Sequence, residues 1–287
     1  MTDSGLLSLI VTLPGLSCLS APFMQHALVG LLLLAPMTAV MGVQVVNFRM
    51  AFFSDAISHS AFAGVAMGLI LSLNPHGAML LFGVLVGIGI MAVQRGSSLA
   101  SDTVIGVFFS AVVAFGLAVV SRDRSVARDL QPFLYGDILT IDRPSLLYLA
   151  LLLTVIMIFQ GLGYNRMLYI GLNPLLAATH RVRVAVYQYL FAGLLSLVVI
   201  FAVWAVGVLL VTALLIVPAA TARNLARSAG GMFWWALTVS LSSSVVGLIL
   251  SAQDWTRTAT GATIVLVACG WFAISLITTI GRGRAER

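Results

Sequence analysis

Residues 26–46 read HALVGLLLLAPMTAVMGVQVV, a stretch without a single Asp, Glu, Lys or Arg. A helix needs about 20 mostly apolar residues to cross the hydrocarbon core of a bilayer. Comparable apolar runs follow at Asp55–Leu73, His76–Val93, Thr103–Ser121, Pro144–Gln160, Ala185–Val206, Gly207–Ala222, Met232–Ala252 and Ala259–Ile280. We therefore predict an all-α, polytopic helical membrane protein with about eight or nine transmembrane helices.

The composition supports the bilayer as the solvent. Hydrophobic residues make up 61% of the chain and charged residues only 8%, whereas a soluble domain carries about 25% charged residues. Membrane-spanning β-strands would instead appear as alternating segments of about 10 residues. We predict a single transmembrane domain over residues 1–287, in which residues 1–25 form an N-terminal interfacial segment with a short helix at Leu6–Leu13.

One predicted span is unusual. The run Gly207–Ala222 is short and contains Pro218, which removes a backbone hydrogen bond and bends a helix. We expect either a kinked span or a half-helix here, and a packing role and a role as a gate both remain open.

The charged residues exclude several functions. All basic residues are Arg, and Glu286 is the only Glu. A GxxxxGK phosphate-binding loop and an HExxH zinc-protease helix are therefore both missing, and we do not expect an enzyme. The net charge of +6 is typical of a membrane protein rather than of a nucleic-acid-binding protein.

The Arg residues also predict the orientation. Cytoplasmic loops of membrane proteins are rich in Lys and Arg. If nine segments cross the membrane, one side receives Arg49, Arg95, Arg166, Arg181, Arg183, Arg223, Arg227, Arg282, Arg284 and Arg287. That side should be cytoplasmic, and the loop Arg122–Arg143, whose charges balance, should face outward.

Asp55 and His59 are the most informative polar residues. They stand four apart at the start of an apolar run, so they share one helical face. A carboxylate and an imidazole at this spacing provide half of a site for zinc, manganese or iron(II). Two alternatives remain: Asp55 could cap the helix with His59 as its hydrogen-bond partner, or act as a proton relay in a secondary carrier.

A row of small residues accompanies this pair. Ala56, Ser60, Gly64 and Gly68 repeat at intervals of four, a pattern that lets a second helix approach closely within a membrane. We therefore expect the pair to lie beside a tight helix contact rather than against lipid.

Several motifs resemble one known family, the permease subunits of bacterial zinc, manganese and iron ABC importers. The segment around the pair, Arg49-Met-Ala-Phe-Phe-Ser-Asp-Ala-Ile-Ser-His-Ser-Ala-Phe-Ala-Gly64, resembles the second-helix motif of this family. Further similar segments follow in the expected order, at Asp102–Gly106, Pro132–Leu139, Gly207–Arg223 and Gly261–Val265. Together they extend over nearly the whole chain.

The resemblance implies a fold, a role and partners. It implies a permease like those of type II ABC importers, in the bacterial cytoplasmic membrane, with Asp55 and His59 as the metal ligands in the pathway. The transported ion would be zinc, or alternatively manganese or iron(II), with no permanently bound cofactor. The expected partners are a cytoplasmic ABC ATPase, an extracytoplasmic metal-binding protein, membrane lipid and a second permease copy, identical or not.

The segment from Tyr164 to Arg183 is expected to be the cytoplasmic coupling segment. Its part that resembles the family's ATPase-docking helix consists of Gly171, Asn173, Pro174, Leu175, Leu176, Ala177 and Ala178. Asn173 suits the N-cap position and Pro174 the first helical position. An ordinary interfacial loop helix is the alternative.

Other polar residues are weaker candidates. Thr212, Pro218 and Thr221 could line or gate the pathway, and His26 and His76 could be accessory ligands near the outer face. A lone histidine in such a position is more often structural.

Overall fold

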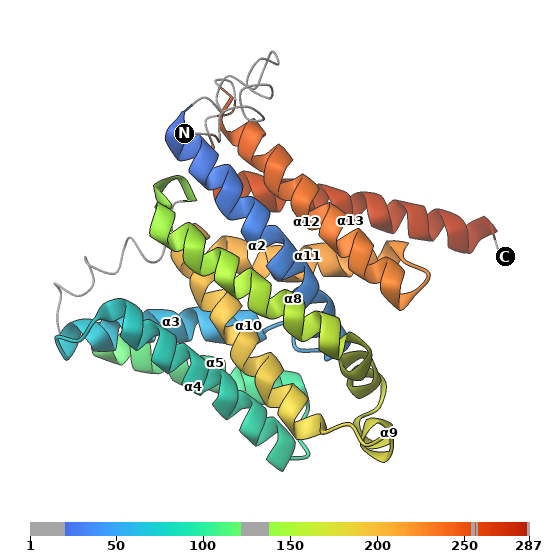
Figure 1. Ribbon diagram of the computed structural model, residues 1–287, viewed down its shortest axis with the longest axis horizontal. Helices are drawn as coiled ribbons and strands as arrows, with labels where there is room; N and C mark the ends of the chain where they lie inside the picture. The colour runs from blue at the N-terminus through green and yellow to red at the C-terminus, as the bar shows by residue number, and fades with distance from the viewer. Residues whose placement is uncertain (1–20, 122–137, 254–255, 257, 286–287) are drawn as a thin grey trace.

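The computed structural model describes residues 21–121, 138–253, 256 and 258–285 (Figure 1). The predicted helix at Leu6–Leu13 and most of the motif Pro132–Leu139 lie outside these residues. The helices are α2 (Pro22–Asn47), α3 (Phe53–Ile70), α4 (Pro75–Gly96), α5 (Ser101–Val120), the 3-10 turn η2 (Ile138–Thr140), α8 (Arg143–Leu172), α9 (Pro174–Thr179), α10 (Val184–Val206), α11 (Val208–Leu225), α12 (Ala229–Ser251) and α13 (Thr260–Ala285). The described part of the chain contains no strand.

The helix count agrees with the sequence. Within the described ranges, eight helices are long and apolar enough to cross a membrane, and α11 is a shorter apolar helix beside them. The protein is therefore a multi-pass helical membrane protein. Its best buried helices are α2 and α3, and α2 packs against α8, α11 and α12 while α3 packs against α4 and α5 (Figure 1).

The row of small residues on α3 does make a tight helix contact. A Cβ added at Gly64 would lie 2.9 Å from the backbone oxygen of Ala78, and one added at Gly68 would lie 2.9 Å from the Cβ of Ala78. Helix α4 therefore approaches α3 more closely than any larger side chain would allow. This contact fixes α3 along the half that follows Asp55 and His59.

Helix α8 is longer than predicted. The apolar run was expected to end at Gln160 and to give way to a cytoplasmic segment from Tyr164. Instead one helix continues to Leu172, over 30 residues, because Gly161 and Gly163 do not interrupt it. At 1.5 Å per residue it is about 45 Å long, so part of it must extend beyond a hydrocarbon core of about 30 Å.

Asp142 fixes the beginning of α8. Its carboxylate is the N-cap and accepts a hydrogen bond from the backbone N–H of Ser145, at 3.1 Å, and one from the Ser145 hydroxyl. These bonds, with a smaller contribution from the charge of His26, hold the pKa of Asp142 below its usual range.

Gly207 separates α10 from α11. It has φ 83°, a left-handed conformation that glycine adopts without steric cost. Helix α11 then continues without a break through Pro218 to Leu225, so the segment predicted as a kinked span or a half-helix is a continuous helix of 18 residues.

Helix α11 also lies directly against α2. A Cβ added at Gly42 of α2 would lie 2.0 Å from the backbone oxygen of Leu215. The two backbones therefore touch at this point, which places α11 where it can reach α3.

Candidate functional site

Helix α3 carries Asp55 and His59 one turn apart, and both side chains are half-buried. Asp55 lies in the first turn, where its charge interacts favourably with the helix dipole. The N-cap residue is Phe52, and no side-chain hydrogen bond caps this end of the helix. Asp55 is therefore not the N-cap residue, although its charge lies in the first turn as the capping alternative expected.

Thr212 of α11 reaches the carboxylate. Its hydroxyl donates a hydrogen bond of 2.6 Å to Oδ1 of Asp55. Hydrogen bonds to a charged acceptor are short and strong, so this contact fixes the rotamer of Asp55 and leaves Oδ2 available to another partner. The sequence suggested Thr212 as a polar contact, and the structure brings it to the proposed metal ligand.

Phe109 of α5 lies against the imidazole. The two rings meet edge to face, with centroids 5.1 Å apart and an interplanar angle of 87°. No hydrogen bond joins His59 to Asp55 in the part of the chain that the structure describes, so His59 is not the partner of the carboxylate. Sequence reasoning missed Phe109, because a Phe in an apolar run carries no signal of its own.

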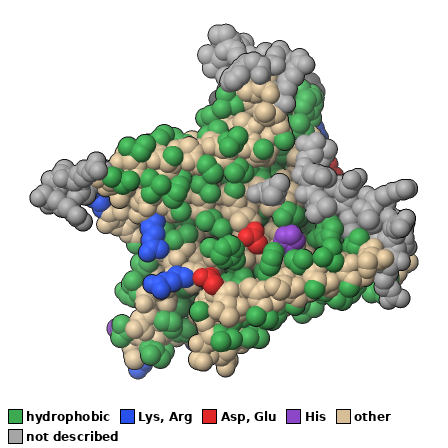
Figure 2. Space-filling view, turned by 180° about the vertical axis from the view of Figure 1, so that it is seen from behind, with side chains coloured by type: hydrophobic (Ala, Val, Ile, Leu, Met, Phe, Trp, Pro, Cys, Tyr) green, Lys and Arg blue, Asp and Glu red, His purple; other side chains and the backbone are tan. Residues whose placement is uncertain are grey.

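Apolar side chains lie around the pair: Phe109 packs against His59, and Ala56 and Ile57 beside them on α3 are fully buried. Figure 2 shows acidic and histidine side chains in the middle of a face that is otherwise largely hydrophobic, with Arg side chains gathered to one side. An ionisable side chain within an apolar helical bundle is costly and rare. Such a residue commonly marks an ion pathway or a functional site.

One copy of the chain brings together only two side chains of the kinds that bind metal ions, Asp55 and His59. A carboxylate oxygen and an imidazole nitrogen are both good zinc ligands, but zinc is almost always four-coordinate in closed sites. Among the described residues no group of three or more His, Cys, Asp or Glu side chains could hold a metal ion. A metal ion held by this pair would need further ligands from water or from another molecule.

The other predicted pathway residues lie apart from this pair. Pro218 is buried in α11, about 9 Å beyond Thr212 at 1.5 Å per residue. Thr221 is fully buried, and its hydroxyl donates to the backbone oxygen of Val217, at 2.8 Å. That is a bond within its own helix.

The two accessory histidines lie elsewhere. His26 is the fifth residue of α2, near Asp142. His76 is in the first turn of α4, and its ring meets that of Trp204 edge to face at 5.3 Å. Neither is on the helices that carry Asp55 and Thr212.

The predicted coupling residues form a short helix with a defined cap. Asn173 accepts hydrogen bonds from the backbone N–H groups of Leu175, at 2.9 Å, and Leu176, at 3.3 Å, with Pro174 at the first helical position of α9. This local structure agrees with the prediction. Leu175 and Leu176 are 80% and 59% exposed, whereas Ala177 is buried. Gly171 and Ala178 flank this surface, in the last turn of α8 and within α9.

Known proteins resemble this chain over most of its length. The sequence pattern of the ABC 3 transport family matches residues 20–279. The high-affinity zinc uptake system membrane protein ZnuB of Haemophilus influenzae is 32% identical over 245 residues, 85% of this chain and 93% of the relative. The manganese import system permease protein ScaB of Streptococcus gordonii is 34% identical over 253 residues, 88% of this chain and 90% of the relative.

A solved structure agrees with these relatives. A chain of PsaBC from Streptococcus pneumoniae, solved in complex with Fab, superposes with a TM-score of 0.77 at 31% identity, over 91% of this chain and 94% of that one. Sequence match, relatives and architecture thus point the same way: the chain belongs to the ABC 3 transport family.

Proposed function

We propose that the chain is the membrane permease of an ABC importer that moves a divalent metal ion into a bacterial cell, with zinc as the primary substrate. The observation that carries this proposal is the carboxylate of Asp55, one turn from His59 and bonded to Thr212, inside an apolar bundle. Its relatives include permeases named for zinc, for manganese and, in one Haemophilus influenzae protein, for iron. Manganese and iron(II) are therefore the alternative substrates.

The ligand chemistry favours zinc. Affinity of a nitrogen and oxygen site rises from manganese through iron(II) to zinc in the ordinary series of divalent ions. A second permease copy would add another Asp55 and His59, giving two carboxylates and two imidazoles around a shared route. Such a set holds an ion while the copies are close and releases it when they separate.

Two partner proteins complete the proposed importer. A cytoplasmic ATPase would dock on α9, where Leu175 and Leu176 are exposed on the short capped helix. An extracytoplasmic metal-binding protein would deliver the ion to the outer ends of the helices. ATP hydrolysis would drive alternating access, and this chain would itself catalyse no covalent reaction.

Uptake by reconstituted vesicles tests the proposal. The complex of this chain with its ATPase should accumulate zinc only with ATP, and Asp55→Asn or His59→Ala should each abolish uptake while expression and dimerisation stay near normal. Asp102→Asn is the matched control, since Asp102 is an exposed acidic residue in the first turn of α5. Competition by manganese and iron(II) in the same assay ranks the ions.

Two results would contradict the proposal. If both variants of the pair still transport zinc, the metal route lies elsewhere. If the chain alone takes up zinc under a pH gradient, without ATPase or ATP, it is a secondary carrier in which Asp55 relays protons.

A further inference from the structure

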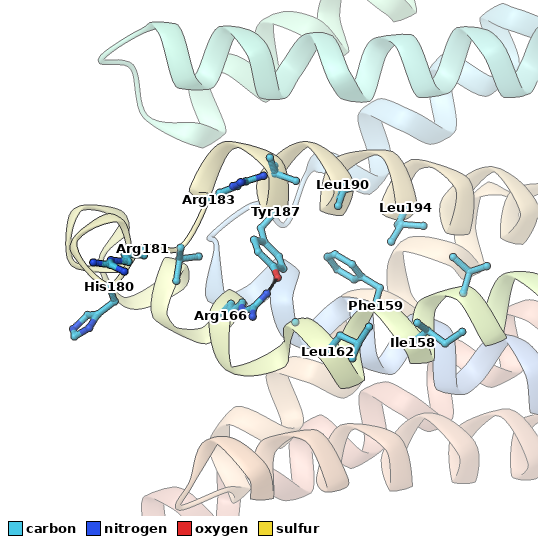
Figure 3. Close-up of a pocket in the computed structure, with 14 residues that line it drawn as sticks. Ile158, Phe159, Leu162, Arg166, His180, Arg181, Arg183, Tyr187, Leu190 and Leu194 are labelled. Carbon is cyan, nitrogen blue, oxygen red and sulfur yellow. Dashed lines mark hydrogen bonds between the residues drawn. The ribbon is translucent and has the colours of Figure 1, made fainter.

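A groove of about 730 Å³ lies between α8 and α10, away from the Asp55 pair. Its lining residues follow one face of each helix, because on α8 they include Ile158, Leu162 and Arg166 and on α10 they include Tyr187 and Leu190. Figure 3 shows these side chains converging from the two helices. Leu162 and Leu190 are exposed, so the groove is open to the outside of this chain.

The groove is basic at one end and apolar along the rest. The end next to α9 is lined by Arg166 of α8 and by Arg181 and Arg183 before α10. Leu162 and Leu190 line the part farther from α9 (Figure 3). Leu162 is 76% exposed and Leu190 49%. The cationic end is the cytoplasmic end by the Arg distribution.

The length of the groove matches one leaflet. From Arg183 to Leu194 the α10 face extends about 16 Å at 1.5 Å per residue. Half of a hydrocarbon core of about 30 Å is about 15 Å. A molecule that fills the groove therefore carries its charge at the membrane surface and reaches the middle of the bilayer with its apolar part.

The cations at the end of the groove are available to an anion. Arg166 donates a hydrogen bond to the hydroxyl of Tyr187 and lies over the ring, 5.6 Å from its centroid. This contact orients the guanidinium but leaves its positive charge uncompensated. None of Arg166, Arg181 and Arg183 forms an ion pair with an acidic side chain in the described ranges, and no acidic residue lines the groove.

We propose that this groove binds one anionic phospholipid of the cytoplasmic leaflet, with the phosphate held by Arg166 and Arg183, assisted by Arg181, and an acyl chain along Leu162 and Leu190. Basic pockets between helices on the cytoplasmic side are suited to anionic headgroups. An apolar helix of a partner protein would fill the deep part but leave three cations unpaired, and a soluble protein cannot enter at bilayer depth.

Lipid retention by the complex of the permease with its ATPase tests the site. The delipidated complex is placed in phosphatidylcholine nanodiscs with a small fraction of phosphatidylglycerol, and bound phosphatidylglycerol is counted by native mass spectrometry. The intact complex should retain one phosphatidylglycerol per permease in preference to phosphatidylcholine. Arg166→Gln with Arg183→Gln should weaken retention by roughly tenfold or more, since each basic residue near the surface adds to the binding of anionic lipid.

Matched variants separate this site from general surface charge. Arg95→Gln removes a cation at the end of α4, outside the groove, and should retain the lipid. Leu190→Trp should expel it by filling the groove without changing charge, whereas Leu151→Trp, at a 68% exposed position of α8 outside the groove, should not. If the double Arg variant fails to fold, the comparison of Leu190→Trp with Leu151→Trp still tests the site.

Three outcomes would overturn the inference. The first is equal retention by the intact complex, the Leu190→Trp variant and the double Arg variant. The second is equal binding of phosphatidylcholine and phosphatidylglycerol. The third is full displacement of the lipid by inorganic phosphate, which would make the basic end a site for a soluble anion.

Discussion

The hydroxyl of Thr212 donates a 2.6 Å hydrogen bond to Oδ1 of Asp55, and this bond joins α11 to α3 near the beginning of each helix. The two residues are far apart in sequence, so their contact depends on how the helices pack. The same carboxylate is the proposed metal ligand. The orientation of the Asp55 carboxylate therefore depends on Thr212, which is not itself a proposed metal ligand.

Replacing Thr212 by Val tests this orienting role. The variant keeps the shape but loses the hydroxyl, and hydrogen bonds to charged groups are worth about 1.5–3 kcal/mol. We expect the zinc concentration for half-maximal uptake to rise by about tenfold, the effect of about 1.4 kcal/mol. Thr212→Ser keeps the donor and should behave like the natural chain, as measured by zinc uptake in vesicles. An unchanged concentration dependence in the Val variant would show that Asp55 needs no such support.

The contact between Gly42 and Leu215 predicts a packing effect. An Ala at residue 42 would place its Cβ 2.0 Å from the Leu215 oxygen, and overpacking of this kind costs about 1–3 kcal/mol. We expect Gly42→Ala to lower the Tm of the detergent-solubilised protein by several degrees. Gly106→Ala is the control, because a Cβ there meets nothing within 4 Å. Equal Tm values for both variants would mean that α2 and α11 separate easily.

Removing the N-cap of α9 should uncouple ATP hydrolysis from zinc uptake. Asn173→Ala removes the side chain that accepts from Leu175 and Leu176, at a cost of about 1 kcal/mol. A helix of six residues has little stability of its own, so we expect ATP hydrolysis to continue while zinc uptake falls severalfold. Asn173→Asp restores an acceptor and should restore coupling.

Substitution of the exposed leucines addresses the same surface directly. Leu175→Ser with Leu176→Ser should weaken ATPase binding to the permease in a pull-down assay. Unchanged binding would count against docking at α9.

Asp142 predicts a pH dependence of stability. Its folded-state pKa is lowered, chiefly by the Ser145 hydroxyl, so the ionised carboxylate stabilises the protein above the pKa of the unfolded chain. That contribution disappears as pH falls through the lowered folded value. Asp142→Asn should therefore have a slightly lower Tm than the natural chain at pH 7, and the difference should vanish in strong acid. A constant difference across this range would contradict the assignment.

The apolar runs predicted the membrane class and most helices, because a bilayer imposes a simple length requirement. Element ends were less predictable. The apolar run ended at Gln160 and a separate coupling segment was expected from Tyr164, yet α8 continues to Leu172, since a helix outside the hydrocarbon core needs no apolar sequence. The spacing of Asp55 and His59 predicted their shared face from helix geometry alone.

The sequence did not predict which polar side chains meet between helices. The sequence offered Thr212 and Thr221 equally, but the Thr212 hydroxyl bonds to Asp55 of α3, whereas the Thr221 hydroxyl bonds to Val217 within its own helix. The groove between α8 and α10 could not be predicted from the sequence either. Its three Arg residues were already explained by the excess of Lys and Arg in cytoplasmic loops.

The unbroken course of α8 has a mechanical consequence. From Arg143 to Leu172 the chain is one continuous helix whose only proline, Pro144, stands in the first turn, and α9 follows directly at its end. A displacement of α9 would therefore be transmitted along a continuous helix about 45 Å long. It would reach the opposite side of the membrane. Glycines inserted midway along α8 would make it flexible. A displacement of α9 would then no longer be transmitted to the Asp142 end of α8, while α9 itself would keep its structure.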